Sequence, residues 1–328
     1  MIDSGPDGQF RPAQPAIKGL PLDGIIYQSV PGFEDHLKKE LSSSPGGQIK
    51  QWGPFFHVSP VPAGDVFWHH NTWLYPHKIE FKSINEAAGI LREIQRNWAS
   101  LLFAQFRRGA LISSKLPVIS HKPRPFPWKL PQTPMGAWTL LDANSMLFSP
   151  SCSSPFPAGV ISFEEDHEGP PSRAYLKLWE ALVRLRRWPA QGERCLDAGA
   201  SPGGWTWALS RLGAEIIAVD RAPLEDRIAA LPGVSFIRHD AFTLTPESIG
   251  PIDWLFCDLI CYPPRLYEWI EKWLTSGLCS NFVCTIKMQE RGGVDFDTPR
   301  RLNKIPGSQV LHLYHNKHEL CWLKTKQV

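Results

Sequence analysis

The chain has 328 residues, 43% of them hydrophobic and 20% charged, which is an ordinary balance for a globular protein of about two domains. The net charge of +3 gives no support to nucleic-acid binding, so any such function has to follow from how the charges are distributed. Seven cysteines without a CxxC pair argue against both a disulfide framework and a cysteine-based zinc site. The absence of a secretory signal and of an apolar run of about 18 residues predicts a soluble cytoplasmic protein without a membrane contact.

The first half of the chain predicts a flexible tail followed by an α+β region. Residues 1–21 are rich in Gly, Pro and Asp, as expected for a poorly ordered tail. A strand is expected at 24–30 and a helix at 33–41, where apolar residues recur at every fourth position. The later elements expected in this half are a helix at 84–104 and strands at 138–147 and 158–163.

A small histidine group lies within this region. His69, His70 and His77 are close in sequence, but no obvious carboxylate or cysteine partner accompanies them. Ligand sets need more than proximity in sequence, so packing or surface roles are favoured over a metal site.

Residues 94–141 contain no Asp or Glu but are rich in basic side chains. The basic residues are Arg96, Arg107, Arg108, Lys115, Lys122, Arg124 and Lys129. Phe126 and Trp128 lie among them. Because basic side chains neutralise phosphates and exposed aromatic rings stack on unpaired bases, this stretch favours RNA contact. The alternative is a proline-rich linker with solvated charges and aromatic rings buried in the core.

Residues 195–209, CLDAGASPGGWTWAL, predict a buried strand, a turn of small residues and a helix. Asp197 is expected to leave the strand. Gly199, Gly203 and Gly204 have no Cβ, so the backbone here can turn sharply and approach a ligand closely. Ligands of open α/β sheets bind beyond the carboxyl ends of the strands, which predicts a cofactor turn. It is not a P-loop, because GxxxxGK[ST] is absent.

Further apolar runs downstream each end in a charged residue. The runs are 215–220, 234–240, 252–258 and 281–287. Their last residues are Asp220, Asp240, Asp258 and Lys287, and a sheet built only for packing has no reason for this pattern. Asp220 lies 23 residues after Asp197, where an acid holds ribose hydroxyls in dinucleotide-binding folds.

Two final strands are expected at 309–314 and 319–324, joined by a short polar turn. A hairpin makes the last strand antiparallel, so its first residue lies at the edge where the parallel strands end. Glu319 is therefore expected close to Asp258 and Lys287.

The predicted fold class is α/β, with a Rossmann-like methyltransferase sheet of seven strands whose last strand is antiparallel. Residues 164–328 form this domain, beginning with a linker at 164–171. Residues 22–163 form the smaller α+β region before it.

The motifs of this chain resemble those of the FtsJ-type RNA ribose 2'-O-methyltransferases, and among them the RlmM type, which acts on large-subunit ribosomal RNA. The resemblance covers roughly the C-terminal half. It is carried by DAGASPGG, PSRAYLKLWEA, CDLICYPP, the strand ending in Lys287, and LYHNKHE. It implies S-adenosyl-L-methionine as cofactor, ribosomal RNA as partner and no metal. A strand, PGFE and a helix near the N-terminus also resemble the ferredoxin-like segment of RlmM-type enzymes, which implies an RNA-binding, THUMP-like region.

The resemblance implies a catalytic Lys-Asp-Lys-Glu set of Lys177, Asp258, Lys287 and Glu319. Lys287 is the candidate base or hydroxyl-orienting group. Burial and the neighbouring Lys177 are expected to lower the pKa of Lys287, while the two carboxylates oppose that shift.

The resemblance also implies a set of cofactor-binding residues. These are Ser172, Gly199, Ser201, Pro202, Gly203, Gly204, Trp205, Asp220, Asp240 and Asp258. Asp220 would bind the ribose hydroxyls and Asp240 the adenine amine. Ser172 is also the expected N-cap of a helix beginning at 171–172, on which Lys177 lies.

Three other functions are compatible with parts of the pattern. A base N-methyltransferase would favour an Asn/Asp-Pro-Pro-aromatic motif, but Asp258 is followed by Leu259. An RNA-binding protein without catalysis would have no need of the complete Lys-Asp-Lys-Glu set. A dehydrogenase would favour a GxGxxG turn, which is absent.

Overall fold

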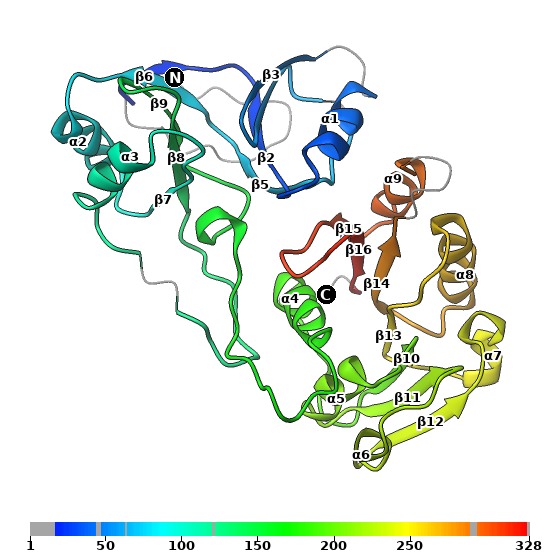
Figure 1. Ribbon diagram of the computed structural model, residues 1–328. Helices are drawn as coiled ribbons and strands as arrows, with labels where there is room; N and C mark the ends of the chain where they lie inside the picture. The colour runs from blue at the N-terminus through cyan, green and yellow to red at the C-terminus, as the bar shows by residue number, and fades with distance from the viewer. Residues whose placement is uncertain (1–16, 44–46, 63, 120–121, 289–293, 327–328) are drawn as a thin grey trace, which may run out of the picture.

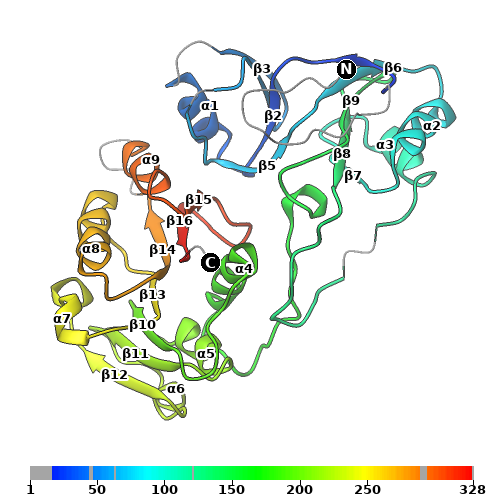
Figure 2. The same cartoon turned by 180° about the vertical axis from the view of Figure 1, so that it is seen from behind.

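The computed structural model of the protein describes residues 17–43, 47–62, 64–119, 122–288 and 294–326. The N-terminal strands and helices form one body, and a larger sheet with its helices forms a second body below it (Figures 1 and 2). Within these ranges, no helix combines the length and apolar character needed to cross a membrane.

The N-terminal body contains two sheets. The first has the order β3-β4-β2-β5 and carries helix α1. Its elements are β2 (Ile25–Ser29), α1 (Glu34–Ser42), β3 (Gln48–Trp52), β4 (Phe55–Ser59) and β5 (His69–Trp73). The first predicted strand and helix are thereby confirmed to within one residue at each end.

The second sheet has the order β1-β6-β9-β8-β7, with β7 and β8 parallel and the other pairs antiparallel. Its strands are β1 (Leu20–Pro21), β6 (His77–Glu80), β7 (Trp98–Ser100), β8 (Gly136–Leu140) and β9 (Ser145–Ser149). Helices α2 (Ile84–Ile94) and α3 (Phe106–Ser113) accompany it. The predicted tail is wrong where it reaches β1, which pairs with β6; residues 1–16 lie outside the described residues.

The predicted helix at 84–104 is wrong beyond Ile94. The indole Nε1 of Trp98 donates to the carbonyl oxygens of Leu91 at 2.8 Å and Gln95 at 3.0 Å. This donor satisfies carbonyl oxygens at the end of α2, and the chain then enters β7. Apolar spacing alone did not reveal this break.

The strands predicted at 138–147 and 158–163 are also corrected. The first is two strands, because the Asp142 carboxylate accepts from the Asn144 amide at 2.8 Å and the Ser145 hydroxyl at 2.6 Å and so builds a turn between them. The second contains one turn of 3-10 helix, η1 (Pro157–Gly159), and Phe163 forms only an isolated bridge to Arg124.

The C-terminal body is built on a seven-stranded sheet of order β12-β11-β10-β13-β14-β16-β15. Its strands are β10 (Arg194–Ala198), β11 (Glu215–Asp220), β12 (Val234–Arg238), β13 (Trp254–Cys257), β14 (Asn281–Lys287), β15 (Ser308–Leu311) and β16 (Glu319–Lys324). Strand β16 is antiparallel to both of its neighbours, whereas β10 to β14 are parallel. The predicted Rossmann-like sheet with a reversed last strand is confirmed.

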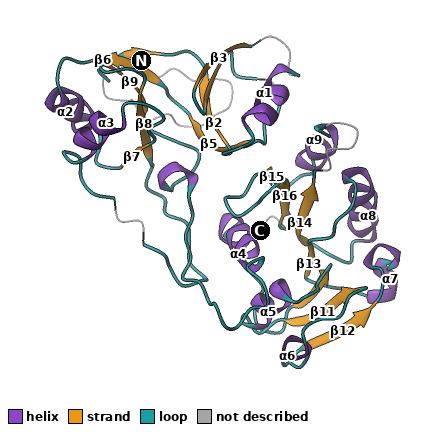
Figure 3. Cartoon of the chain, in the orientation of Figure 1, coloured by secondary structure: helices purple, strands orange, loops and turns teal. Residues whose placement is uncertain are grey.

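Helices cover both faces of this sheet (Figure 3). They are α4 (Tyr175–Leu185), α5 (Gly204–Ser210), α6 (Asp226–Ala229), α7 (Pro246–Ile249), α8 (Pro263–Ser276) and α9 (Asp297–Asn303), with a 3-10 turn η2 (Ala241–Thr243). Alternate residues of β14 point to opposite faces of the sheet. Phe282 and Cys284 belong to an apolar cluster with α8, whereas Val283 belongs to one with α4 and α5. All seven cysteines are buried and free, as expected for core residues.

The two bodies meet at the turn that precedes β16. The Phe33 ring stacks on His318, with centroids 5.3 Å apart and planes 12° from parallel. The His36 and His318 Nε2 atoms lie 3.0 Å apart, and Arg300 donates to the Ser43 hydroxyl at 3.2 Å. Helix α1 therefore lies next to the loop that leads into Glu319.

Candidate active site

The glycine-rich turn lies between β10 and α5, as predicted, but Asp197 remains inside the strand, which runs on to Ala198. Gly203 has φ +116°, and a Cβ there would lie 2.7 Å from the side chain of Ile228. A Cβ on Gly204 would lie 2.6 Å from the Ser172 hydroxyl. Both positions therefore require glycine if the turn is to pack this tightly.

Asp220 and Asp240 lie at the carboxyl ends of neighbouring strands and line one cavity of about 90 Å³. The Asp220 carboxylate accepts from the backbone amides of Ser201 at 3.1 Å and Ala222 at 2.9 Å. Asp240 accepts from the Phe242 amide at 3.0 Å. These bonds fix the orientation of both carboxylates beside the glycine-rich turn.

Most of the other predicted cofactor residues lie on the turn rather than in this cavity. Trp205 is buried, and its Nε1 donates to the Ala174 carbonyl at 2.9 Å. The Ser201 hydroxyl donates to the Pro223 carbonyl at 2.8 Å. Ser172 does not cap the helix, because α4 begins at Tyr175.

Sequence reasoning missed several residues that line the cavity between Asp220 and Asp240. They are Arg221, His239, Ala241, Phe242, Leu259, Ile260 and Arg265. The Arg265 guanidinium lies 4.4 Å from the centre of the Phe242 ring. His239, Ala241 and Leu259 each lie next to an acidic residue at the end of a strand, and this position could have indicated that they line the site. No local feature of the sequence indicated Arg265.

Lys177, Asp258, Lys287 and Glu319 come together from α4, the end of β13, the end of β14 and the start of β16. Lys177 Nζ lies 3.1 Å from Asp258 Oδ1 and 2.5 Å from Glu319 Oε1. Lys287 Nζ lies 2.7 Å from Asp258 Oδ1 and also pairs with Glu319 Oε2. Each ammonium thus contacts both carboxylates, and this cluster is called the tetrad below. The predicted convergence of three strand ends is confirmed by the register that sets Lys287 opposite Glu319.

The electrostatics of the tetrad differ from the expectation for Lys287. Burial lowers the pKa of Lys287, but the carboxylates of Asp258 and Glu319 outweigh burial and raise it above its usual range. Burial likewise raises the pKa of Asp258, but Lys177 and Lys287 hold it below its usual value. The predicted lowering of the Lys287 pKa is therefore wrong, because two carboxylates contact this ammonium.

Two further residues support the tetrad and were not foreseen. The Thr285 hydroxyl donates to Asp258 Oδ1 at 2.6 Å. Glu180 is fully buried in α4, and its carboxylate accepts from the backbone amides of Tyr314 and His315, both at 3.0 Å. Glu180 thereby holds the loop before Glu319. The only local feature of the sequence that could have indicated a role for Glu180 is its position one helical turn after Lys177.

Phe126 and Trp128, the two aromatic residues predicted to contact RNA, pack inward. The Phe126 ring stacks on Trp179 with centroids 5.0 Å apart, and Trp128 meets Phe156 edge-on at 5.6 Å. The Arg124 guanidinium lies 5.1 Å from the centre of the Trp128 ring. The expectation that these rings are exposed for base stacking is wrong, because both rings pack against the apolar cluster that includes α4.

The predicted histidine group separates in space. His77 stacks on Phe148 with centroids 5.2 Å apart, whereas His69 and His70 begin β5. The His70 ring faces His312, with centroids 5.2 Å apart. No group of three or more His, Cys, Asp or Glu side chains is arranged to hold a metal ion in the described part of the chain.

Comparison with known proteins agrees with this geometry. Residues 170–293 match the family model of FtsJ-like methyltransferases. The chain is 33% identical over 181 residues to "Ribosomal RNA large subunit methyltransferase M" of Azoarcus sp. (strain BH72), which covers 51% of this chain and 49% of that protein. It is 35% identical over 185 residues to the protein of the same name from Xanthomonas campestris pv. campestris (strain B100), covering 53% and 52%. The chain thus spans about half the length of the curated relatives it matches, and the predicted resemblance is confirmed over that half.

Proposed function

We propose that this protein uses S-adenosyl-L-methionine to methylate a ribose 2'-hydroxyl of RNA, with large-subunit ribosomal RNA as the substrate. The observation that carries the proposal is the tetrad, in which two ammonium groups and two carboxylates meet at the carboxyl edge of the sheet. The match of residues 170–293 to FtsJ-like methyltransferases and the names of the relatives support the same reaction.

The cofactor fits the residues at the glycine-rich turn. Asp220 and Asp240 present carboxylates at the ends of adjacent strands, where they would accept hydrogen bonds from the ribose hydroxyls and the adenine amine of an adenosine. Gly203 and Gly204 hold the turn in this tightly packed form, and the turn would bind the remainder of the ligand. When bound, the cofactor supplies an electrophilic methyl group on a sulfonium.

The tetrad provides orientation and charge stabilisation for the hydroxyl. Since the carboxylates raise the pKa of Lys287, this residue is an ammonium at neutral pH and acts as the hydroxyl-orienting group. A positioned ammonium also stabilises the negative charge that develops on the attacking oxygen. The carboxylates of Asp258 and Glu319, which both contact the Lys287 ammonium, would accept the proton that the hydroxyl loses.

We propose that residues 22–163 bind RNA and that residues 164–328 carry out the methyl transfer. The support is a group of exposed basic side chains, although Phe126 and Trp128 pack against the apolar cluster that includes α4. The exposed basic residues are Arg96, Arg107, Lys115, Lys122, Arg124 and Lys129. Replacing Arg107, Lys122 and Arg124 together by Ala should weaken RNA binding and flatten its dependence on salt. An unchanged salt slope would mean that these charges are solvated only.

The reaction is tested with labelled S-adenosyl-L-methionine and ribosomal RNA from cells lacking the modification, followed by mapping of the methylated atoms. Label on a ribose oxygen is expected. Label on a base nitrogen would replace the proposal by base methylation. RNA and cofactor binding without any transfer would favour an RNA-binding protein that lacks catalysis.

A further inference from the structure

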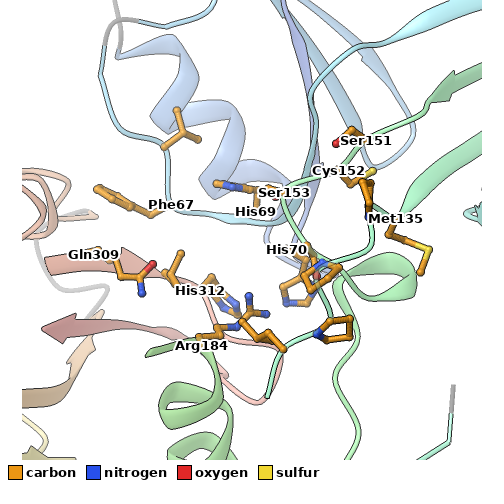
Figure 4. Close-up of a pocket in the computed structure, with 18 of the residues that line it drawn as sticks. Phe67, His69, His70, Met135, Ser151, Cys152, Ser153, Arg184, Gln309 and His312 are labelled. Atoms are coloured by element: carbon orange, nitrogen blue, oxygen red, sulfur yellow. The ribbon is translucent and has the colours of Figure 1, made fainter. Parts of the chain in front are cut away.

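A cavity of about 860 Å³ lies between the two bodies, away from the glycine-rich turn (Figure 4). One wall comes from the N-terminal body, where β5 begins with His69 and His70. The opposite wall comes from the end of α4, at Arg184 and Arg186, and from the edge strand β15. Segments 130–135 and 151–155 complete the lining. Pockets of about 300–1,000 Å³ are the size that encloses small organic ligands.

This cavity reaches the edge of the sheet at which the tetrad lies. Strand β15 runs parallel to β14, because both are antiparallel to β16. The carboxyl end of β15, next to His312, therefore lies on the same edge as Lys287. His312 Nε2 lies 3.0 Å from the Lys317 carbonyl oxygen, so one short loop separates the lining of the cavity from Glu319.

The inner part of the lining consists of uncharged polar rings. Burial lowers the pKa of His70 and of His312 to about 4, so both imidazoles are neutral at physiological pH. A neutral imidazole has one donor and one acceptor nitrogen. Within the described residues, His69 Nδ1, His70 Nε2 and His312 Nδ1 are buried without a hydrogen-bond partner. Figure 4 shows the His70 and His312 side chains directed toward each other, with Arg184 beside them. Buried polar atoms without a partner are costly, and water or a polar ligand that reaches them would remove that cost.

The outer part of the lining carries positive charge. Arg184 is held by Glu180 at 2.8 Å, whereas Arg186 is exposed. Arg186 ends α4 with φ +56°, a left-handed conformation that favours glycine. A side chain kept at a strained position is a reason to look for a function. Guanidinium groups suit phosphates, and Asp65 is the one acidic residue in the described lining.

We propose that this cavity binds one unpaired nucleotide of the RNA substrate, close to the nucleotide whose ribose is methylated, with a phosphate at Arg186 and the base against the paired rings of His70 and His312. The inference rests on the proposed function and adds to it a requirement for single-stranded RNA beside the target. A cavity with polar rings and a cationic rim accepts a base that has left its helix, whereas the bases of a duplex stay paired and stacked.

The test is fluorescence anisotropy with a labelled single-stranded RNA of about ten nucleotides and with the corresponding duplex. Arg186→Gly removes the guanidinium and leaves a residue suited to the left-handed backbone, so the fold is preserved. Thr133→Trp, at an exposed position in the lining, fills the cavity. Each variant should weaken single-strand binding about tenfold or more and change duplex binding little. Thr275→Trp, at an exposed position on α8 that is outside the lining and outside the stretch 94–141, is the matched control and should bind as the wild type does.

The outcomes separate this inference from the proposed function. Calorimetric titration with S-adenosyl-L-methionine checks that each variant retains its cofactor site. Wild-type protein that methylates RNA while both variants bind single strands normally would overturn the cavity assignment and leave the proposed function intact. Equal weakening of duplex and single-strand binding would also overturn it. Wild-type protein that binds no RNA at all would remove the proposed function, and this inference with it.

Discussion

Glu180→Gln removes a single buried charge that links α4 to the loop before Glu319. In the wild-type protein this carboxylate is fully buried and contacts the Arg184 guanidinium at 2.8 Å and the His315 Nδ1 atom at 2.8 Å. It also accepts from the backbone amides of Tyr314 and His315. The glutamine side chain has nearly the same shape, but it has no charge, and its NH₂ group would face backbone donors.

The expected magnitude follows from the pKa of the carboxyl group. Burial raises the pKa of Glu180, but Arg184 and His315 outweigh burial and lower it from its ordinary value of 4.5 to about 2. At roughly 1.4 kcal/mol per pH unit, the ionised carboxylate stabilises the folded state by about 3 kcal/mol at pH 7. Because the folded pKa is the lower one, this stabilisation is present above pH 4.5 and is lost as the pH falls toward 2.

Urea unfolding at pH 7 and pH 3 measures this effect. We expect Glu180→Gln to lower the free energy of unfolding by about 3 kcal/mol at pH 7 and by less than half of that at pH 3. Glu225→Gln is the control, because Glu225 pairs with Arg227 at the surface and its loss should cost under about 0.5 kcal/mol. A loss at pH 7 no larger than that of the control, or one independent of pH, would refute the assigned role of Glu180.

The remaining predictions concern the tetrad, the adenosine site and the core. Lys287→Ala should reduce methyl transfer by about 100-fold or more while S-adenosyl-L-methionine binding, measured by calorimetry, stays nearly unchanged; near wild-type transfer would exclude Lys287 from the mechanism. Asp240→Ala should weaken binding of S-adenosyl-L-methionine by about 1–3 kcal/mol, and binding of NAD in its place would contradict the cofactor assignment. Burial raises the pKa of Asp197 to about 7, so the folded state loses stability as the pH rises from about 4 to 7. Asp197→Asn should therefore be more stable than the wild type in urea unfolding at pH 8, by about 1–3 kcal/mol, and should show no such gain at pH 4.

The order of strand-like runs in the sequence was enough to predict the sheet and the edge at which the site lies. Parallel neighbouring strands have their carboxyl ends at the same edge of the sheet. The charged residues that end these runs must therefore lie together at that edge. Asp258 and Lys287 followed from this rule. Glu319 followed from the reversal of the last strand, and its pairing opposite Lys287 agrees with that reasoning.

Only the tertiary structure decided the charge state of the site and the packing of the aromatic residues in the basic stretch. The pKa of Lys287 depends on how many carboxylates contact its ammonium, and both of them lie on other strands. Phe126 packs on Trp179 although its own neighbourhood in sequence predicts an exposed, RNA-contacting ring. Glu180 bonds to His315, 135 positions away. Local periodicity records which face of an element is apolar, but burial and ion pairing depend on distances between segments that are far apart along the chain.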